Sequence, residues 1–176
     1  KSLLKKKAFF LDRDGVINES LVEKNKPKAP LDLSQFRIIE GVKESLQILK
    51  QKNYLNIIIT NQPDVNLGIL SKSTVSEMHK IIYEELAIDD IFVCFHNDKD
   101  NCFCRKPKPG LVYEAEKKWG IDTDNSFLIG DRWRDIDLAS TLGMKSFFID
   151  YNYNEPKPKN YNHKVSSLKE AVGLLD

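Results

Sequence analysis

Short, continuously apolar runs recur along the chain, and segments with apolar residues at helical spacing lie between most of them. A run of this kind is typical of a strand that is buried on both faces of a parallel sheet. We predict such strands at residues 8–11, 55–60, 90–94, 126–130 and 145–149. We predict helices from Gly41 to about Lys52, over residues 73–86, 111–119 and about 132–142, and from Ser167.

This alternation of strands and helices predicts the fold class. It continues from one end of the chain to the other, and no repeat period appears. Strand–helix–strand units give a parallel sheet with right-handed crossovers and helices on both faces. We therefore predict an α/β protein, a single doubly wound, Rossmann-like domain over residues 1–176 without a cap domain. Residues 18–40 and 151–164 lack periodicity and are expected to form loops.

Composition and charge narrow the possible function classes. The chain has 176 residues, of which 41% are hydrophobic and 30% charged, and 27 basic residues oppose 26 acidic ones. This near-neutral balance does not support a nucleic-acid or anionic membrane partner. No apolar run approaches the ~18 residues that span a bilayer. The apolar run after Lys5–Lys7 is too short for a signal peptide, so we expect a cytoplasmic protein.

Two acidic residues follow the first predicted strand. Asp12 and Asp14 come directly after the run at residues 8–11, and Gly15 permits a tight turn. In open α/β sheets, ligands bind just beyond the carboxyl ends of the strands. Two acids one residue apart repel each other unless a cation or a shared proton compensates their charge. The pattern favours a ligand site, although it also occurs in calcium loops and in turns that Asp side chains stabilise.

Polar residues also follow the other predicted strands: Thr60 and Asn61, Arg105 and Lys106, and Asp131 and Asp135. Because parallel strands end at one edge of the sheet, these side chains can converge in one cleft. Carboxylates at Asp12 and Asp131 suit Mg²⁺. The Thr60 hydroxyl and the Lys106 ammonium suit phosphate oxygens. A carboxylate can attack phosphorus while a second acid protonates the leaving oxygen, so the set predicts phosphoryl transfer.

Each of these residues also has a purely structural interpretation. Alone, Lys106 would be a solvated lysine in a basic loop, and Thr60 would be the β-branched end of a strand. Asp131 alone would be a helix N-cap. The functional interpretation depends on all of them following strands in one chain.

All three cysteines and one of the three histidines lie within eleven residues. They form two pairs with one intervening residue, Cys94 with His96 and Cys102 with Cys104. In extended chain, residues two apart point to the same side, so each pair can bind one ion. Three thiolates and an imidazole are a tetrahedral Zn²⁺ set with no open position. We therefore predict a structural zinc loop at about residues 94–104; the alternative is three free thiols and a surface histidine.

In order along the chain, these motifs resemble the haloacid dehalogenase superfamily of phosphatases. The four motifs of that family match Asp12-Arg-Asp14-Gly15, Thr60, Lys106, and Gly130-Asp131 through Asp135. The resemblance implies that Asp12 is the nucleophile and Asp14 the acid and then the base. It also implies Mg²⁺ bound by Asp12, Asp131 and the backbone carbonyl of Asp14. Asp135 would either support the metal site from outside or stabilise the start of the following helix.

The cysteine cluster makes the chain similar to the capless, zinc-loop branch of this superfamily. That branch contains D-glycero-D-manno-heptose 1,7-bisphosphate phosphatases and histidinol-phosphate phosphatases. By this resemblance Asn61, Gln62, Arg105 and Arg132 line the substrate site. The chain differs at residues 63–68, Pro-Asp-Val-Asn-Leu-Gly, where the heptose enzymes commonly have Ser-Gly-Ile and an arginine before the glycine. These differences affect which sugar phosphate we expect the chain to bind, but not the expected phosphoryl-transfer chemistry.

Four functions can be weighed against these features. The most distant is a nucleic-acid 3′-phosphatase, which would need a basic groove with stacking aromatics that the near-neutral charge does not support. The leading one is a Mg²⁺-dependent phosphatase that forms an aspartyl phosphate and acts on a heptose bisphosphate or similar sugar phosphate, as a monomer. The alternative keeps the mechanism and takes histidinol phosphate. A zinc-stabilised binding module without catalysis is the fourth, but the presence of both Asp12 and Asp14 argues against it.

Overall fold

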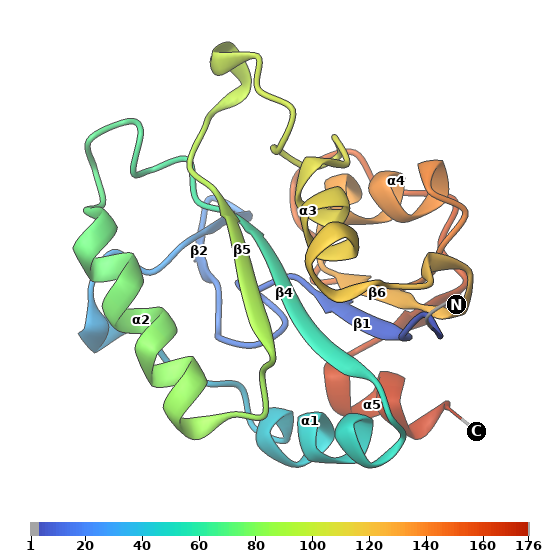
Figure 1. Ribbon diagram of the computed structural model, residues 1–176. Coiled ribbons are helices and arrows are strands. Elements are labelled where there is room, and N and C mark those ends of the chain that lie inside the picture. The colour runs from blue at the N-terminus through green and yellow to red at the C-terminus, as the bar shows by residue number, and fades with distance from the viewer. Residues whose placement is uncertain (1–3, 176) are drawn as a thin grey trace.

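The computed structural model describes residues 4–175, which contain one six-stranded sheet in the order β5-β4-β1-β6-β7-β8. Every neighbouring pair in this sheet is parallel. Its strands are β1 (Ala8–Leu11), β4 (Leu55–Asn61), β5 (Asp90–Cys94), β6 (Phe127–Gly130), β7 (Lys145–Ile149) and β8 (His163–Val165). The five predicted strands and the α/β class are therefore confirmed. β1 lies inside the sheet, between β4 and β6 (Figure 1).

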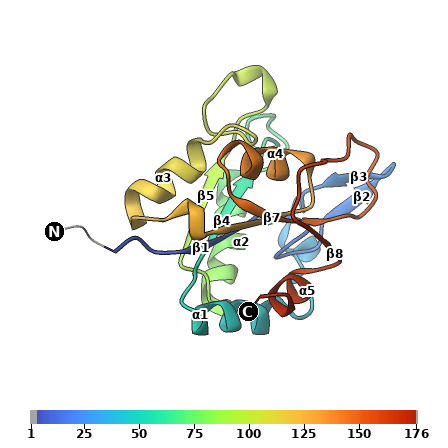
Figure 2. The same ribbon diagram turned by 90° about the vertical axis from the view of Figure 1, so that its right-hand side faces the viewer.

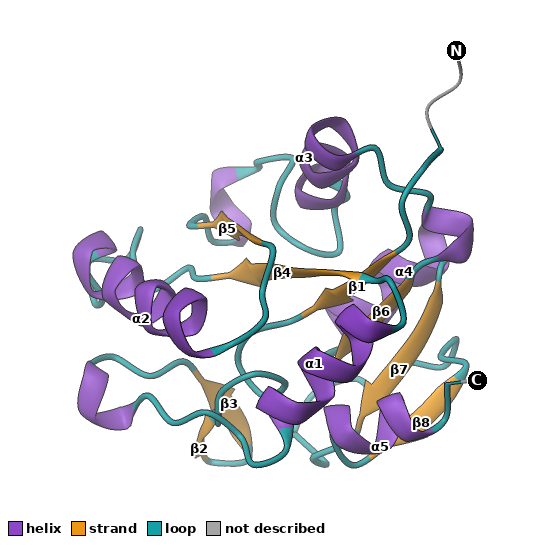
Figure 3. Ribbon diagram, turned by 60° about the horizontal axis from the view of Figure 1, so that its bottom comes forward, coloured by secondary structure: helices purple, strands orange, loops and turns teal. Residues whose placement is uncertain are grey.

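Helices cover both faces of this sheet (Figure 1). The helices are α1 (Val42–Gln51), α2 (Lys72–Glu85), α3 (Gly110–Trp119), α4 (Trp133–Thr141) and α5 (Leu168–Gly173). α1 and α5 lie side by side on one face, as Figure 3 shows, while α3 and α4 pack on the other. All five predicted helices are confirmed to within one residue at each predicted end.

The side chains of β1 alternate between two apolar clusters, one on each face. Phe9 and Leu11 are buried with side chains of α1, α2 and α5. Ala8 and Phe10 are buried with side chains of α3 and α4. This alternation follows from the two-residue period of a strand. It explains why the run at residues 8–11 is apolar throughout, since each face of β1 packs against a helix layer.

Two segments that we predicted as loops contain strands. Residues 18–40 include an antiparallel hairpin of β2 (Leu21–Glu23) and β3 (Lys26–Lys28). Residues 151–164 run into β8, which pairs in parallel with β7 at the far edge of the sheet (Figure 2). Each of these strands has only three residues, too few to show a period in the sequence. His163, which we expected in a loop, lies in β8 and stacks on Phe147.

Within residues 4–175, no helix is both long and apolar enough to cross a membrane.

A tight turn directly follows β1. The Arg13 carbonyl accepts hydrogen bonds from the N–H groups of Ile17 and Asn18, at 2.8 and 3.2 Å. Gly15 lies in this turn with φ of +88°, a conformation that favours glycine. A Cβ at Gly15 would also collide with the carboxylate of Asp131, at the end of β6. The position therefore needs glycine both for its backbone angle and for space.

We expect Gly15→Ala to destabilise the fold more than Gly68→Ala, measured as the free energy of unfolding in denaturant. Both glycines have positive φ, but a Cβ at Gly68 would meet nothing within 4 Å. Gly68→Ala should cost about 1–2 kcal/mol from backbone strain alone. Gly15→Ala should cost at least about 1 kcal/mol more because of the collision. Equal costs would contradict the close approach of Gly15 to Asp131.

Candidate active site

The ends of β1, β4 and β6 and the loop before α3 meet in one cleft of about 280 Å³. We call it the strand-end cleft. Its charged lining residues include four acids, Asp12, Asp14, Asp131 and Asp135, and four bases, Arg105, Lys106, Arg132 and Arg134. The predicted convergence is therefore present for these charged residues and for Asn61, but not for Thr60, because parallel strands end at the same edge of the sheet and Thr60 lies buried behind the lining. Residues 27–29 of the β2–β3 hairpin form part of the rim.

Lys106 lies at the centre of the buried charges. Its Nζ donates to Asp12 Oδ1 at 3.0 Å, to Asp135 Oδ1 at 2.6 Å and to the Ile59 carbonyl at 2.8 Å. Burial opposes the charge of this ammonium, but the two carboxylates raise the pKa of Lys106 and keep it protonated. All three donors of the lysine are used, so its position is fixed. Lys106 is therefore buried and paired, unlike the solvated lysine of the structural interpretation.

Asp12, Asp131 and Asp135 form a carboxylate cluster whose oxygens lie within 4.8 Å of one another. All three are buried, and Lys106 supplies one positive charge, which leaves two negative charges unbalanced. Burial first, and then the charges of Asp12 and Asp135, raise the pKa of Asp131 well above its usual range. Its Oδ1 has no hydrogen-bond partner, although it is buried.

This cluster fits a divalent cation. An unpartnered buried oxygen and a deficit of two charges are what a bound Mg²⁺ would satisfy, and carboxylate oxygens are its preferred protein ligands. The second oxygen of Asp131 accepts from the Tyr153 hydroxyl at 2.7 Å, so that contact leaves Oδ1 free. Asp135 stabilises the start of α4, as one of the two possibilities considered from the sequence, and it also pairs with Lys106. Its Oδ2 accepts from the Arg132 N–H at the start of α4.

Asp14 lies outside the carboxylate cluster and has other partners. Its Oδ1 accepts from Arg13 Nε at 3.0 Å, from Arg13 Nη2 at 2.7 Å and from Asn18 Nδ2 at 2.9 Å. Its Oδ2 accepts from Gln62 Nε2 at 2.9 Å. The same Gln62 nitrogen donates to Thr60 Oγ1. Thr60 and Gln62 are fully buried and lie behind the lining of the strand-end cleft, whereas Asp14 lines it.

The remaining predicted substrate residues are held by partners near the cleft. Asn61 pairs with the backbone of Lys106, accepting from its N–H at 3.1 Å and donating to its carbonyl at 3.3 Å. This pair joins the end of β4 to the loop before α3. Arg105 forms an ion pair with Asp98 at 2.8 Å, and Arg132 forms one with Glu155 at 2.6 Å. Both arginines still line the cleft, where their charge favours an anionic ligand.

Several residues that shape the site were missed by the sequence analysis. They are Arg13, His79, Asp98, Arg134, Tyr153 and Glu155. Tyr153 and Glu155 come from the aperiodic segment 151–164, and Asp98 lies between predicted zinc ligands. Nothing in the spacing of these residues indicates a role, because each reaches the site through a long-range contact. Only the position of Arg13, between the two acids of the first motif, was a usable signal.

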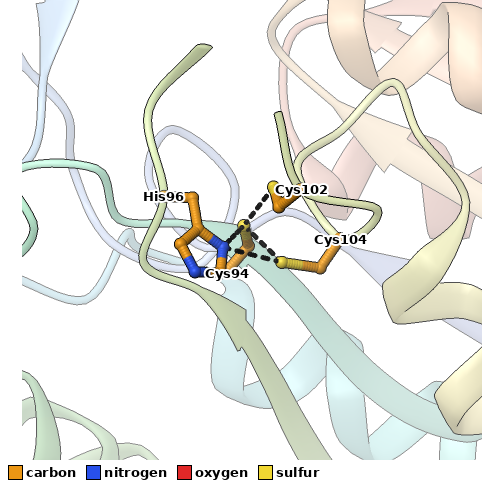
Figure 4. A group of neighbouring side chains, drawn as sticks. All are labelled: Cys94, His96, Cys102 and Cys104. Carbon is orange, nitrogen blue, oxygen red and sulfur yellow. Dashed lines mark hydrogen bonds between the residues drawn. The ribbon is translucent and has the colours of Figure 1, made fainter. Parts of the chain in front are cut away.

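The four predicted zinc ligands lie together: Cys94 ends β5, and His96, Cys102 and Cys104 follow in the loop after it. This loop is near the top of Figure 1. Figure 4 shows the three sulfur atoms and His96 Nδ1 directed toward one another. Cys94 Sγ is 3.7 Å from Cys102 Sγ, and His96 Nδ1 is 3.3 Å from Cys104 Sγ. These two separations suit ligands at about 2.0–2.3 Å from one tetrahedral zinc. Cys94 Sγ and Cys104 Sγ lie closer, 2.6 Å apart, so this pair would move apart on binding the ion. Burial raises the pKa of the Cys94 thiol, so a bound cation would be needed to hold it as a thiolate.

Comparisons with known proteins show what the chain is similar to. A family model described as polynucleotide kinase 3 phosphatase matches residues 7–168. The D-glycero-beta-D-manno-heptose-1,7-bisphosphate 7-phosphatase of Pasteurella multocida is 34% identical, over 97% of this chain and 97% of that protein. The enzyme of the same name from Helicobacter pylori strain 26695 is 35% identical, over 96% and 97%. The D-glycero-alpha-D-manno-heptose-1,7-bisphosphate 7-phosphatase of Campylobacter jejuni is 31% identical, over 98% and 97%.

Solved structures share the fold. The D,D-heptose 1,7-bisphosphate phosphatase from B. bronchiseptica, complexed with magnesium and phosphate, superposes with a TM-score of 0.78. It is 21% identical, and the superposition covers 95% of this chain and 96% of that one. The corresponding protein from Burkholderia thailandensis gives a TM-score of 0.65 at 18% identity, over 95% and 96%.

We expect Asp131→Asn to stabilise the protein when no divalent cation is present. The pKa of Asp131 is higher in the folded than in the unfolded protein. The free energy of unfolding therefore falls as the pH rises from the unfolded-state pKa to the folded-state pKa. Because asparagine does not ionise, thermal unfolding in EDTA near pH 7.5 should show a higher melting temperature for Asp131→Asn than for the wild type. Asp137→Asn removes the same charge from an exposed position on α4 and should change little. Lower stability in Asp131→Asn would contradict the charge deficit.

Proposed function

This chain belongs to the haloacid dehalogenase superfamily of phosphatases, and from that membership we propose that it hydrolyses the 7-phosphate of D-glycero-D-manno-heptose 1,7-bisphosphate or a similar sugar phosphate. The observation that carries the substrate is the 31–35% identity, over nearly the whole length of both chains, to phosphatases of that name. The contact between Lys106 and Asp12 supports the chemistry, because it places a fixed cation beside a carboxylate nucleophile.

In this proposal Asp12 attacks phosphorus. Burial alone would raise the pKa of Asp12, but the Lys106 ammonium lowers it, so the carboxylate is ionised at neutral pH. An oxygen of Asp12 forms a bond to phosphorus as the bond to the sugar oxygen breaks, and Asp14 gives its proton to that leaving oxygen. Water then attacks the aspartyl phosphate, Asp14 takes a proton from the water, and the bond between phosphorus and Asp12 breaks. Both acids return to their starting states.

Mg²⁺ would be held by Asp12, Asp131 and the backbone carbonyl of Asp14, and its positive charge would favour binding of the phosphate oxygens. Lys106 would place its positive charge close to the same oxygens, and Asp135 holds Lys106 in place. Thr60 and Gln62 complete the support of Asp14 through their hydrogen bonds. Asn61, Arg105 and Arg132 contact the rest of the substrate.

Zn²⁺ would be held by Cys94, His96, Cys102 and Cys104, with no ligand position left for substrate. Its role is to fix the loop directly before Arg105 and Lys106. Three clustered, unpaired cysteines suit a reducing compartment, so the proposal includes a cytoplasmic enzyme. The near-neutral charge favours a small metabolite over nucleic acid or membrane, and the enzyme is proposed to act as a monomer.

We expect the purified protein with Mg²⁺ to release phosphate from heptose 1,7-bisphosphate faster than from histidinol phosphate or a 3′-phosphorylated oligonucleotide. Asp12→Asn should abolish release, because an amide does not form the acyl phosphate. Preference for histidinol phosphate would instead support the alternative substrate. Preference for the oligonucleotide would follow the description of the matching family model. Retained activity in Asp12→Asn would contradict the assignment of the nucleophile.

We expect Cys102→Ser to lose bound zinc and to lower the melting temperature, with activity reduced only as far as the loop loses its structure. Phe103→Ala changes the neighbouring, exposed side chain and should keep one zinc per chain by elemental analysis. A Cys102→Ser protein that is zinc-free yet as stable as the wild type would contradict the structural role of the ion.

A further inference from the structure

Arg13 lies between the two acids of the first motif, yet its side chain is directed into the protein interior. It is the largest side chain among the described residues that is fully buried. A buried guanidinium must have its donors satisfied and its charge paired, since leaving it unpaired is costly. The partners of Arg13 therefore show what the protein uses it for.

Asp14 is the carboxyl partner of Arg13, and the oxygen that Arg13 contacts can accept whether or not the other oxygen carries a proton. Nε and Nη2 of Arg13 donate to the same oxygen, Asp14 Oδ1, at 3.0 and 2.7 Å. Asn18 Nδ2 also donates to that oxygen, at 2.9 Å. Three donors thus hold Oδ1, whereas Oδ2 has one, from Gln62. The more lightly bonded Oδ2 is therefore the oxygen of Asp14 that is available to give and take a proton.

The other end of the guanidinium is held by α2. Arg13 Nη1 lies 3.2 Å from His79 Nε2 and 3.6 Å from the sulfur of Met78. The ring of Phe36 lies 5.6 Å from the guanidinium carbon. Because arginine only donates, His79 Nε2 must be the accepting nitrogen, and the imidazole proton lies on Nδ1.

A neutral His79 is consistent with its surroundings. Burial, followed by the charge of Arg13, lowers the pKa of His79 to about 4. The imidazole therefore remains an acceptor throughout the neutral range, and α2 holds the guanidinium in one orientation. A positively charged His79 would lose this contact and repel Arg13.

We propose that Arg13 and His79 are positioning residues for the proton transfers of Asp14. His79 fixes the guanidinium, the guanidinium fixes Oδ1, and Oδ2 is left to exchange the proton with the leaving oxygen and then with water. This inference rests on the proposed function, and it connects α2, which contributes no residue to the strand-end cleft, to the chemistry in that cleft.

The test compares two kinds of substrate, a sugar phosphate and p-nitrophenyl phosphate. The sugar alkoxide is a poor leaving group that needs the proton from Asp14, whereas p-nitrophenolate is stable without one. kcat/KM reports the steps up to cleavage of the ester bond, so it isolates the donation of that proton. The ratio of the kcat/KM values for the two substrates should change when Arg13 or His79 is substituted. A general loss of folded enzyme lowers both kcat/KM values equally and leaves the ratio unchanged.

We expect His79→Leu to lower kcat/KM for the sugar phosphate by about tenfold or more, since a misplaced acid loses much of its 10²–10⁴-fold contribution. For p-nitrophenyl phosphate the loss should be at most about threefold. His79→Gln should restore the wild-type ratio, because its side-chain oxygen can accept from Arg13. Arg13→Lys keeps the charge but lacks the planar, forked N–H donors of the guanidinium. It should change the ratio of the two kcat/KM values in the same direction as His79→Leu.

Asn56→Ala is the matched control. Asn56 is fully buried on β4 and bonds to the carbonyls of Leu46 and Ala87, so its loss destabilises the fold without touching Asp14. The ratio of the two kcat/KM values in Asn56→Ala should equal that of the wild type. An unchanged ratio in both His79→Leu and Arg13→Lys would overturn the inference while leaving the proposed function intact. Failure of the wild type to release phosphate from any sugar phosphate would contradict the proposed function itself.

Discussion

The ammonium group of Lys106 lies between the carboxylates of Asp12 and Asp135, and the rest of the site depends on this contact. It joins the loop before α3 to the ends of β1 and β4 and to the start of α4. It also keeps Asp12 ionised in a buried position. One lysine does not balance the three carboxylates of the cluster, and the remaining charge is what suits the site to a divalent cation and a phosphate. The unbalanced negative charge of the cluster lowers the stability of the fold at the site where the proposed reaction needs charge.

A layer of residues behind the strand-end cleft fixes the groups that we propose to react. Tyr153 holds one oxygen of Asp131, and Gln62 contacts Asp14 from the end of β4. The zinc-ligand loop provides Asp98, which pairs with both Arg105 and Arg134 at the cleft. Site geometry of this kind requires supporting residues whose own positions are fixed by packing and hydrogen bonds. The supporting residues come from α2, from the end of β4, from the segment 151–164 and from the loop after β5.

The central features of the site could be predicted from the sequence because they lie where strands end. Asp12 and Asp131 directly follow buried apolar runs, and Lys106 follows the cysteine motif with its fixed ligand spacing. The parallel topology brings the ends of the strands together at one edge of the sheet. The cysteine cluster was predictable because its ligand spacing is local. In contrast, Tyr153 and His79 reach the site through tertiary contacts that leave no local pattern. β8 was missed for the related reason that a three-residue edge strand is too short to show a period.

Asp12 is the residue proposed to receive the phosphoryl group, and every other role assigned in the site follows from that. The direct test is to mix the enzyme with Mg²⁺ and heptose 1,7-bisphosphate, quench with acid within one turnover, and analyse peptides by mass spectrometry. We predict one added phosphoryl group on the peptide that contains Asp12, and none after the same treatment of Asp12→Asn. A phosphoryl group on another residue, or its absence from a turning-over enzyme that otherwise yields an intact Asp12 peptide, would contradict the account.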